Sequence, residues 1–327
     1  MVEFDPQPWE PPKAPKLEGP FAKNTVLASA ELWQTGGVGP EDVAVSDDGT
    51  AYSGLADGTI VRFHRNSGVP QPIANTTGRP LGIEVAGDGS LIVCDAYKGL
   101  LRVTPTGTVS TIVDSFRGER FLFTNNATIA SDGTVYFTVT SRRHGIDRYV
   151  DDLLEHSGTG RLFAVTTDGI IRLIYSDLQF ANGVALNADE TMLYVAETGS
   201  YSVRRFRLTG DRSASVEPFL SNLPGFPDNL TFAEGTLWVA LASPRQPMVD
   251  GMMTHPRLRR MTRRLPEFLK PKPSQHGIVL GFDENGTLTH NLQDAGGRVA
   301  VTTGVRFHDG RLYIGSLTQS TVAIHTL

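Results

Sequence analysis

The stretch Val43-Ala-Val-Ser-Asp-Asp-Gly-Thr-Ala-Tyr52 carries the pattern that decides the fold of this chain. An apolar alternating run leads into an Asp-Gly turn, and a second run with an aromatic end follows at once. Asp-Gly between two such runs is a strong signal for a β-hairpin. Related patterns recur at 83–93, 129–137, 184–195, 230–239 and 305–314. Repeats at spacings of roughly 40 to 75 residues are typical of propellers and solenoids.

A second strand signal that ends in an apolar residue follows each copy. These segments are 58–63, 99–103, 160–165, 202–206, 277–282 and 320–324. Two hairpins per repeat give a four-stranded blade, so the sequence predicts an all-β fold, a six-bladed β-propeller formed by residues 25–327 as one domain. An open sandwich is the alternative, and it would not demand this repetition. We expect the strand 25–33 to complete the last blade beside 322–327, which closes the ring and removes two free edges.

Three segments stand outside the repeats. The prolines between residues 5 and 24 predict an extended, Pro-rich arm over residues 1–24. Insertions near 140–158 and 243–275 stretch two of the intervals between copies. Loop residues mostly lie at the surface, so we expect the same of the four histidines in these insertions, which are His144, His156, His255 and His276.

The second insertion contains a candidate helix. Leu258, Met261 and Leu265 recur at helical spacing. Arginines occupy the other faces, at Arg259, Arg260, Arg263 and Arg264. We expect a short helix that lies over one face of the propeller as a lid, with its Met and Leu side chains forming apolar wall of a pocket. Contact with a membrane or with an anionic ligand is the alternative.

Composition excludes several classes of protein. A hydrophobic content of 39% and a charged content of 20% describe an ordinary soluble globular chain. A net charge of -5 argues against nucleic acid as the default partner. The single cysteine, Cys94, excludes an internal disulfide and a thiolate metal cluster. No stretch has the length of a membrane span or the pattern of a signal peptide, so the sequence predicts a cytoplasmic protein without an integral membrane segment.

The stretch Leu223-Pro-Gly-Phe-Pro-Asp-Asn-Leu230 gives the first functional signal. Its Pro and Gly residues fix the backbone path, and taken alone it is typical of an Asx turn. In a propeller, however, the first strand of each blade lines the central channel. We therefore compare the residues directly before these strands, which are Glu41, Leu81, Asn126, Asn182, Asp228 and Thr303.

Four of these six side chains offer oxygen ligands, and equivalent positions in the blades point to the same axis. Carboxylate and amide oxygens without Cys or His favour calcium over zinc. The alternative is a set of Asx turns bridged by water. Bringing two buried carboxylates together without a cation would be costly, so we expect one central Ca²⁺.

The chain after residue 25 also resembles a known family. The matching motifs are Gly78-Arg-Pro-Leu-Gly-Ile83, Asp95-Ala-Tyr-Lys-Gly-Leu100, Phe180-Ala-Asn-Gly-Val184, Val195-Ala-Glu-Thr198, Pro224-Gly-Phe-Pro-Asp-Asn229 and His308-Asp-Gly-Arg-Leu-Tyr-Ile-Gly315. They resemble strictosidine synthase-like proteins, in the branch of the adipocyte plasma membrane-associated protein, within the gluconolactonase/paraoxonase superfamily. The resemblance implies a six-bladed propeller with a central calcium ion. It also implies the ligands, which are Glu41, Asn126, Asn182, Asp228 and Asn229.

Departures from the family pattern limit the chemistry that the resemblance implies. Strictosidine synthases use a channel Glu as acid and base for amine–aldehyde condensation, and Thr303 stands at that position here. Paraoxonases place a His where this chain has Leu81. Their second, structural calcium also uses an Asp beside the Asn ligand. One ligand of that second site is present here as Asp42. Ala127 is expected at the position of the Asp beside the Asn ligand, so a second ion is not predicted.

These observations favour a calcium-dependent hydrolase that acts on a lactone or another activated ester, with the carbonyl polarised by the metal. Asp228 is the predicted catalytic residue, as general base or nucleophile, and Leu81 and Thr303 are predicted to line the substrate pocket. A binding propeller with a structural calcium ion is the alternative from a different class. Strictosidine synthase-type condensation is a third hypothesis, which Thr303 disfavours. The predicted partner is a small ester or lactone, not a nucleic acid.

Overall fold

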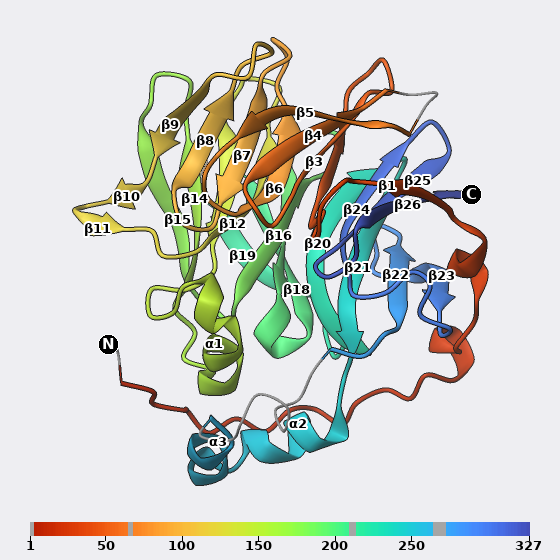
Figure 1. The fold of residues 1–327 in the computed structure, drawn as a ribbon. Coiled ribbons are helices and arrows are strands. Elements are labelled where there is room, and N and C mark those ends of the chain that lie inside the picture. Colours follow the sequence, from red (N-terminus) through yellow and green to blue (C-terminus); the bar gives the residue numbers. More distant parts are fainter. Residues whose placement is uncertain (1–2, 65–67, 209–213, 264–272) are drawn as a thin grey trace.

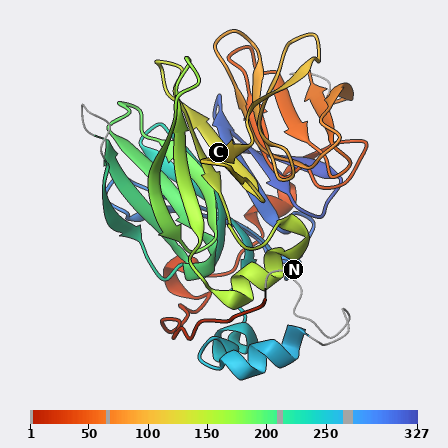
Figure 2. The same cartoon turned by 90° about the vertical axis from the view of Figure 1, so that its left-hand side faces the viewer.

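Six four-stranded antiparallel sheets are arranged as blades around a common axis (Figure 1 and Figure 2). The structure is a computed structural model, and it describes residues 3–64, 68–208, 214–263 and 273–327. In each blade the strands pair in a simple meander, innermost strand first. This arrangement confirms the predicted six-bladed β-propeller.

The first three blades follow the chain without interruption. Blade one consists of β2 (Val43–Val45), β3 (Ala51–Gly54), β4 (Thr59–Phe63) and β5 (Pro70–Asn75). Blade two consists of β6 (Pro80–Val85), β7 (Leu91–Asp95), β8 (Gly99–Val103) and β9 (Val109–Val113). A small hairpin of β10 (Ser115–Phe116) and β11 (Glu119–Arg120) precedes blade three. Blade three consists of β12 (Thr124–Ile129), β13 (Val135–Val139), β14 (Gly160–Val165) and β15 (Ile171–Leu178).

The last three blades complete the ring. Blade four consists of β16 (Ala181–Leu186), β17 (Met192–Glu197), β18 (Ser202–Leu208) and β19 (Ala214–Leu220). Blade five consists of β20 (Gly225–Ala233), β21 (Thr236–Pro244), β22 (Gly277–Phe282) and β23 (Leu288–Asp294). Blade six consists of β24 (Thr302–His308), β25 (Arg311–Ser316), β26 (Thr321–Thr326) and β1 (Glu31–Gln34).

Ring closure joins the two ends of the chain. The strand β1 pairs antiparallel with β26, with Glu31 opposite Ile324 and Gln34 opposite Thr321. The predicted partner of the N-terminal strand is therefore confirmed, but the strand begins at residue 31 and not at residue 25. The preceding residues form the 3-10 turn η2 (Val26–Ser29), before which Asn24 accepts a hydrogen bond from the Val26 amide, and Leu27 of this turn is buried in the core.

Apolar side chains fill the spaces between neighbouring blades. Ile60 of blade one, for example, packs in one buried cluster with Ile83 and Val93 of blade two. Both faces of the middle strands are covered in this way, and the five residues of β7 are all buried. Burial of a Leu, Ile or Val side chain contributes about 1.5–3 kcal/mol, so the blades stabilise one another chiefly through these contacts.

Helices and the N-terminal arm cover one end of the propeller (Figure 1). The first insertion forms the 3-10 turn η3 (Ile146–Arg148) and the helix α1 (Tyr149–Glu155). The second forms α2 (Pro247–Met253) and α3 (Pro256–Arg263). Two further 3-10 turns are η1 (Gly19–Phe21) and η4 (Thr198–Ser200). We call α1, α2, α3 and residues 3–13 of the arm the cap.

The arm lies against all three helices of the cap. The Gln7 amide donates to the Glu155 carbonyl at 2.8 Å, and the Trp9 amide donates to the Met253 carbonyl at 3.1 Å. Phe4 packs with Leu154, Met252 and Met253 in one apolar cluster, against which Trp9 also packs. The arm is thus extended, as its prolines predict, and its first residues are bound to the helices of the cap.

The helix α3 shows the opposite orientation from the predicted one. Leu258 and Met261 are 43% and 65% exposed, whereas Arg259 is fully buried. The Arg259 guanidinium donates to the carbonyls of Leu154 and Gln7, so α3 uses this arginine to hold α1 and the arm together. The prediction that Leu258 and Met261 form apolar wall of a pocket is therefore wrong. Arg264 and Leu265 lie outside the described residues.

Candidate metal centre and cavity

Site residues of five blades lie in β-bulges at the start of the inner strands. The pairing of these five strands with their neighbours skips two residues, between Pro80 and Ile83, Thr124 and Ala127, Ala181 and Val184, Pro227 and Leu230, and Thr302 and Val305. The first inner strand, β2, pairs without such a shift, and Glu41 lies two residues before it. A bulge bends the strand and redirects its side chains, and such features are common next to active sites. The segment that contains Asp228 is therefore a bulged strand in place of a turn with an Asx cap.

The strand register corrects one predicted ligand. Asn182 and Asp228 each lie two residues before the residue that resumes pairing, which is Val184 in one strand and Leu230 in the other. In β12 pairing resumes at Ala127, so the equivalent residue is Asn125 and not Asn126. The prediction that Asn126 occupies this position is wrong by one residue. Asn125 also lines the cavity described below.

Five buried oxygen atoms of the central site have no hydrogen-bond donor among the described residues. They are Glu41 Oε2, Asn125 Oδ1, Asn182 Oδ1, Asp228 Oδ1 and Asn229 Oδ1. All five are acceptors, and they come from the equivalent positions of four blades and from the residue after Asp228. Buried acceptors without donors are costly, and a cation would satisfy them together.

The amide nitrogens of the site are held by threonines, which fixes the direction of the oxygens. Asn182 Nδ2 donates to the Thr198 hydroxyl at 3.0 Å, and Thr198 donates in turn to the Pro227 carbonyl. Asn125 Nδ2 donates to the Thr140 hydroxyl at 2.9 Å. The assignment of oxygen and nitrogen in each amide thus follows from its hydrogen bonds, and it leaves the oxygens free.

At the position directly after each site residue of the inner strands, glycines and polar residues alternate from blade to blade. Blades two, four and six have Gly82, Gly183 and Gly304 there. A Cβ atom on Gly82 would lie 2.6 Å from the Asn126 Cα, and one on Gly183 would lie 2.6 Å from the Asn229 Cα. The glycines therefore make room for the backbone of the following blade, and a side chain at either position would displace a site strand.

A second metal position is not supported. Asp42 Oδ1 accepts from the Val43 amide, and Asp42 Oδ2 accepts from the Ile83 amide and from Asn126 Nδ2. The corrected register places Asn126, in place of Ala127, beside the Asn ligand, so an amide donor meets Asp42 where the resemblance implies a second carboxylate. The Asn126 oxygen accepts from the Val184 amide. These hydrogen bonds satisfy Asp42 without an ion.

Electrostatics of the central site also favour a cation. Burial raises the pKa of Asp228 to about 8. Burial and the nearby charge of Asp228 raise the pKa of Glu41 well above its usual range. Asn229 Nδ2 donates to Glu41 Oε1 at 3.1 Å, which lowers that pKa only in part. The two carboxyls resist ionisation in each other's presence, and a divalent cation would remove that resistance.

The donor set fits calcium. Two carboxylates and three amide oxygens are hard ligands, and Ca²⁺ accepts six to eight of these in loose geometry, with water completing the shell. Among the described residues no group of three or more His, Cys, Asp or Glu side chains is placed to hold a metal. Soft or nitrogen-rich metal sites are therefore not indicated in this part of the chain.

A cavity of about 380 Å³ opens onto these oxygens, and the cap forms part of its wall. Glu41, Asn125, Asn182, Asp228 and Thr303 lie at its polar end, with the arginine Arg79. Both predicted pocket residues, Leu81 and Thr303, line it. Its other walls are apolar and come from the blade loops and the cap, at Phe123, Phe180, Tyr149, Leu153, Phe226 and Met253.

Among the cavity residues with left-handed backbone conformations, which non-glycine residues rarely adopt, two lie directly before inner strands. Phe180 has φ 59° and Val301 has φ 50°. A β-branched residue in this region is strained by roughly 1–3 kcal/mol, which the surrounding structure must offset. Each lies two residues before a site residue, Asn182 or Thr303. The strained residues therefore lie directly before the inner strands that carry the site residues.

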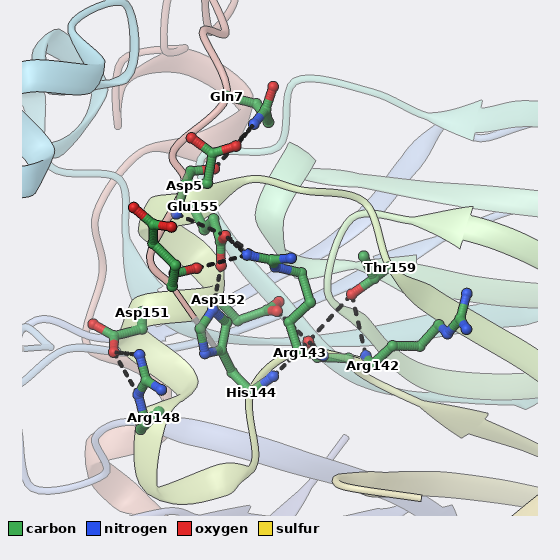
Figure 3. Close-up of polar contacts among 12 residues, drawn as sticks. Asp5, Gln7, Arg142, Arg143, His144, Arg148, Asp151, Asp152, Glu155 and Thr159 are labelled. Atoms are coloured by element: carbon green, nitrogen blue, oxygen red, sulfur yellow. Dashed lines mark hydrogen bonds and ion pairs between the residues drawn. The ribbon is translucent and has the colours of Figure 1, made fainter. Parts of the chain in front are cut away.

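The predicted exposure of the insertion histidines is wrong for three of the four. His144, His156 and His276 are buried because each has a partner inside the protein. His144 and Arg143 both bind Glu155, to which the Asp5 amide also donates (Figure 3). The ring of His156 stacks on Trp9, with the ring centres 4.1 Å apart. No histidine among the described residues lines the cavity. His144 and His156 contact the cap, and His276 forms a hydrogen bond with Gln293 of blade five.

Two residues that the sequence analysis did not assign belong to the site. Asn125 is adjacent to the predicted Asn126, and only the position of the bulge distinguishes them. Arg79 lies in the quoted motif at residues 78–83, two residues before Leu81. Alternation along a strand would have placed Arg79 and Leu81 on one face.

Comparison with protein families matches most of the chain. Residues 55–249 match the SMP-30/gluconolactonase/LRE-like region, and residues 19–63 match the N-terminal region of strictosidine synthase-like proteins. The rat adipocyte plasma membrane-associated protein is 33% identical over 341 residues, which cover 96% of this chain and 90% of the relative. Strictosidine synthase-like protein 6 of Arabidopsis thaliana is 33% identical over 311 residues, which cover 92% of this chain and 82% of the relative.

Solved structures share the fold at low sequence identity. A gluconolactonase from Xanthomonas campestris superposes with a TM-score of 0.68 at 18% identity, over 93% of this chain and 91% of its own. The calcium-binding protein regucalcin from Agrobacterium tumefaciens gives a TM-score of 0.61 at 15% identity, over 90% of this chain and 92% of its own. In the part of the chain that the structure describes, no helix is long and apolar enough to cross a membrane. The predicted cytoplasmic location stays a prediction.

Proposed function

Because this chain belongs to the SMP-30/gluconolactonase/LRE-like family of β-propellers, in its strictosidine synthase-like branch, we propose that it is a calcium-dependent hydrolase of lactones or other activated esters. The observation that carries the proposal is the set of five buried oxygens without donors at the end of an apolar cavity. The named gluconolactonase and regucalcin share the fold and support the choice of chemistry and of metal.

The residues that would hold the ion are Glu41, Asn125, Asn182, Asp228 and Asn229. A calcium ion bound there would polarise a carbonyl oxygen and stabilise the negative charge that develops on it. The threonine-bound amides keep the oxygens in place before any substrate binds, which lowers the cost of reorganisation. Asn126 is not part of this set, since its oxygen already accepts from the Val184 amide.

Asp228 is the side chain that we assign to proton transfer. It lines the cavity and is buried, and a carboxylate at such a position can accept a proton from water; without a cation its pKa is raised to about 8 by burial. A bound cation would lower this pKa and weaken the base. Asp228 would hold the proton of the attacking water at its carboxylate while the apolar walls keep other water from the reacting carbonyl. No histidine of the described chain competes for this role.

Substitution tests separate the ligands from their neighbours. Asp228→Asn is expected to abolish hydrolysis of lactones and aryl esters above background, and a chelator should do the same to the wild type. The matched control is Asp168→Asn, an exposed carboxylate on a distant loop, which should retain full activity. Full activity of Asp228→Asn, or wild-type hydrolysis that a chelator does not change, would contradict the proposal.

Calcium binding tests the corrected register directly. Asn125→Ala should weaken calcium binding by at least the roughly tenfold loss seen when an outer partner of a ligand is removed. Asn126→Ala should leave calcium affinity near wild type and lower stability by about 1–3 kcal/mol, because Asp42 and the Val184 amide lose a buried partner. Titration calorimetry and thermal unfolding distinguish the two variants, and the reverse pattern would restore Asn126 as the ligand.

A binding propeller with a structural calcium ion is the second candidate. It is favoured by the absence of histidines from the described cavity wall and by relatives that are named for membrane association and not for hydrolysis. In that case chelation lowers the melting temperature, and no lactone or ester is turned over. Condensation of an amine with an aldehyde is disfavoured, since Thr303 replaces the acidic residue and its hydroxyl donates to the Glu41 carbonyl at 2.7 Å.

A further inference from the structure

A buried cation in the cavity wall has no role in the chemistry proposed above. Arg79 is 6% exposed and lines the polar end of the cavity with Glu41. Its Nη1 donates to the Gly39 carbonyl at 2.8 Å, two residues before Glu41. Gly39 has φ 74°, and a Cβ atom there would lie 2.9 Å from Arg79 Nη2, so the loop before Glu41 is shaped around this guanidinium.

Arg79 has more donors than the protein uses. A guanidinium carries five N–H donors, and the bond to Gly39 is its one hydrogen bond among the described residues. No ion pair joins it to a carboxylate in the same part of the chain. The negative charge that acts most on Arg79 is that of Glu41, which belongs to the metal centre. Asp95, whose charge acts on Arg79 less, is already bound by the Thr76 hydroxyl and by the amides of Tyr97 and Lys98. A buried charge without a paired partner is costly and marks a position for an anion.

The charges of the site favour a ligand with one negative charge. The carboxylates of Glu41 and Asp228 together balance one divalent cation. Arg79 then adds one positive charge to the cavity lining, to which Asp95 does not belong, and its burial strengthens its interaction with an anion. Arginine is also the residue best suited to a carboxylate, since its planar fork donates two parallel hydrogen bonds.

The remaining walls define the rest of the ligand. Phe123 and Phe180 meet with their rings edge to face, 5.7 Å apart, and pack with Leu81 in one buried cluster beside Arg79. Phe226 and Met253 continue the apolar wall toward the cap. Such walls suit an alkyl or aryl group and offer few partners for the hydroxyls of a sugar.

We infer that the cavity selects amphipathic monoanions, that is, substrates with an apolar body and one carboxylate that Arg79 binds. The inference rests on the proposed function in that the reacting carbonyl of such a substrate would lie at the metal centre. Arg79 is then a specificity-determining residue, and a neutral analogue of the same size would bind less well.

Titration calorimetry of octanoate and octanamide against the full chain tests the inference, with and without calcium. Wild-type protein should bind octanoate roughly 10- to 100-fold more tightly than octanamide, as expected for a charge-assisted hydrogen-bonded pair. Arg79→Gln, which keeps a donor for Gly39, should lose this preference, and Arg79→Lys should regain part of it. Arg161→Met is the matched control, because it removes a buried guanidinium that does not line the cavity.

Hydrolysis provides the second readout. For 4-nitrophenyl esters with and without a terminal carboxylate, the wild type should favour the acid, and Arg79→Gln should lose this through KM and not through kcat. Equal binding of octanoate and octanamide would overturn the inference. So would a preference that survives Arg79→Gln and disappears on chelation, since the metal would then hold the carboxylate. An Arg79-dependent preference without any turnover would reject the proposed hydrolysis and leave the binding inference standing.

Discussion

At the scale of single residues, Asp228 and Glu41 are the groups whose state decides what the site does. Burial raises the pKa of both carboxyls, and the charge of Asp228 raises the pKa of Glu41 further. The hydrogen bond from Asn229 Nδ2 offsets the burial of Glu41 only in part, and Asn182 Nδ2 donates to the Thr198 hydroxyl. The site is therefore built so that a divalent cation and the charged carboxylates favour each other.

The pH dependence of stability follows from the raised pKa of Asp228. The folded value is about 8 and the ordinary value is 3.8, so folding takes up a proton between these limits. The stability that this proton provides is fully present below the ordinary pKa and is lost as pH rises through the folded one. Without calcium, Asp228→Asn should therefore melt higher than wild type at pH 8, and the difference should shrink toward pH 4.

Calcium should reverse this order. At about 100 times its dissociation constant the ion adds about 2.7 kcal/mol to the wild type, and Asp228→Asn should gain much less. Thermal unfolding over pH 4–8, with chelator and with calcium, measures both effects. A chelated wild type that is more stable at pH 8 than at pH 5 would contradict the role of Asp228, as would an equal gain from calcium in both proteins.

Most of the site was predictable at this scale, and its limits have physical causes. Glu41, Asn182 and Asp228 follow from one rule, the residue before each inner strand. Asn125 and Asn126 have the same side chain, and the bulge that separates their roles depends on pairing with β13, which a local pattern does not contain. Arg79 was missed because the role that we propose for it depends on its unused N–H donors, which are a property of the packed structure.

At the scale of elements, the cap shows how far helical periodicity can mislead. The spacing of Leu258 and Met261 correctly predicts a helix, and α3 occupies Pro256–Arg263. Its orientation is set by Arg259, since backbone carbonyls of α1 and of the arm accept hydrogen bonds from both terminal nitrogens of the guanidinium inside the protein. An arginine with such partners can be buried while neighbouring apolar side chains remain exposed. The apolar wall of the cavity comes from α1 and α2 in its place.

The arm is expected to stabilise the cap without stabilising the blades. Deleting residues 1–12 removes Phe4 and Trp9 from the cluster around Leu154 and Met253 and frees the backbone partners of α1 and α2. Hydrogen exchange should then rise in α1, α2 and α3, and affinity for apolar ligands of the cavity should fall, while the strands stay protected.

A matched control distinguishes packing from surface charge in this experiment. Asp5→Ala breaks an exposed ion pair with Arg260, and such pairs contribute about 0–1 kcal/mol, so its exchange pattern should match wild type. Unchanged protection of the cap after deletion would show that the helices hold their positions without the arm. Loss of protection in the blades as well would show that the arm belongs to the cooperative unit of the propeller.

At the scale of the whole molecule, repetition made the fold predictable. Each copy of the hairpin pattern buries its apolar residues against a neighbouring blade, so six copies together predict a closed ring. The pattern of a single strand does not predict its position in the fold with the same strength. Closure also explains why residues as distant as Glu41 and Asn229 meet at one site. The cap was not predictable in the same way, because its path depends on contacts of the arm that occur once in the chain.

Closure of the ring depends on aromatic packing between its first and last blades. Trp33 of β1 is buried, and its ring lies 5.6 Å from that of Phe63 in blade one and 5.9 Å from that of Tyr313 in blade six. Trp33→Ala should lower the free energy of unfolding by about 3–5 kcal/mol, the usual cost of removing a buried Trp or Phe side chain. Val38→Ala is the control, since Val38 is 54% exposed on the loop that follows β1 and its loss should be nearly neutral. Denaturant unfolding measures the stability of both variants, and calcium affinity measured alongside shows whether a loosened closure affects the central site.

Glu41 enters the site from blade one and Asp228 from blade five. A weakened junction between blades six and one should therefore also weaken calcium binding. A destabilised Trp33→Ala protein with unchanged calcium affinity would show that the inner strands keep their arrangement independently of the outer closure.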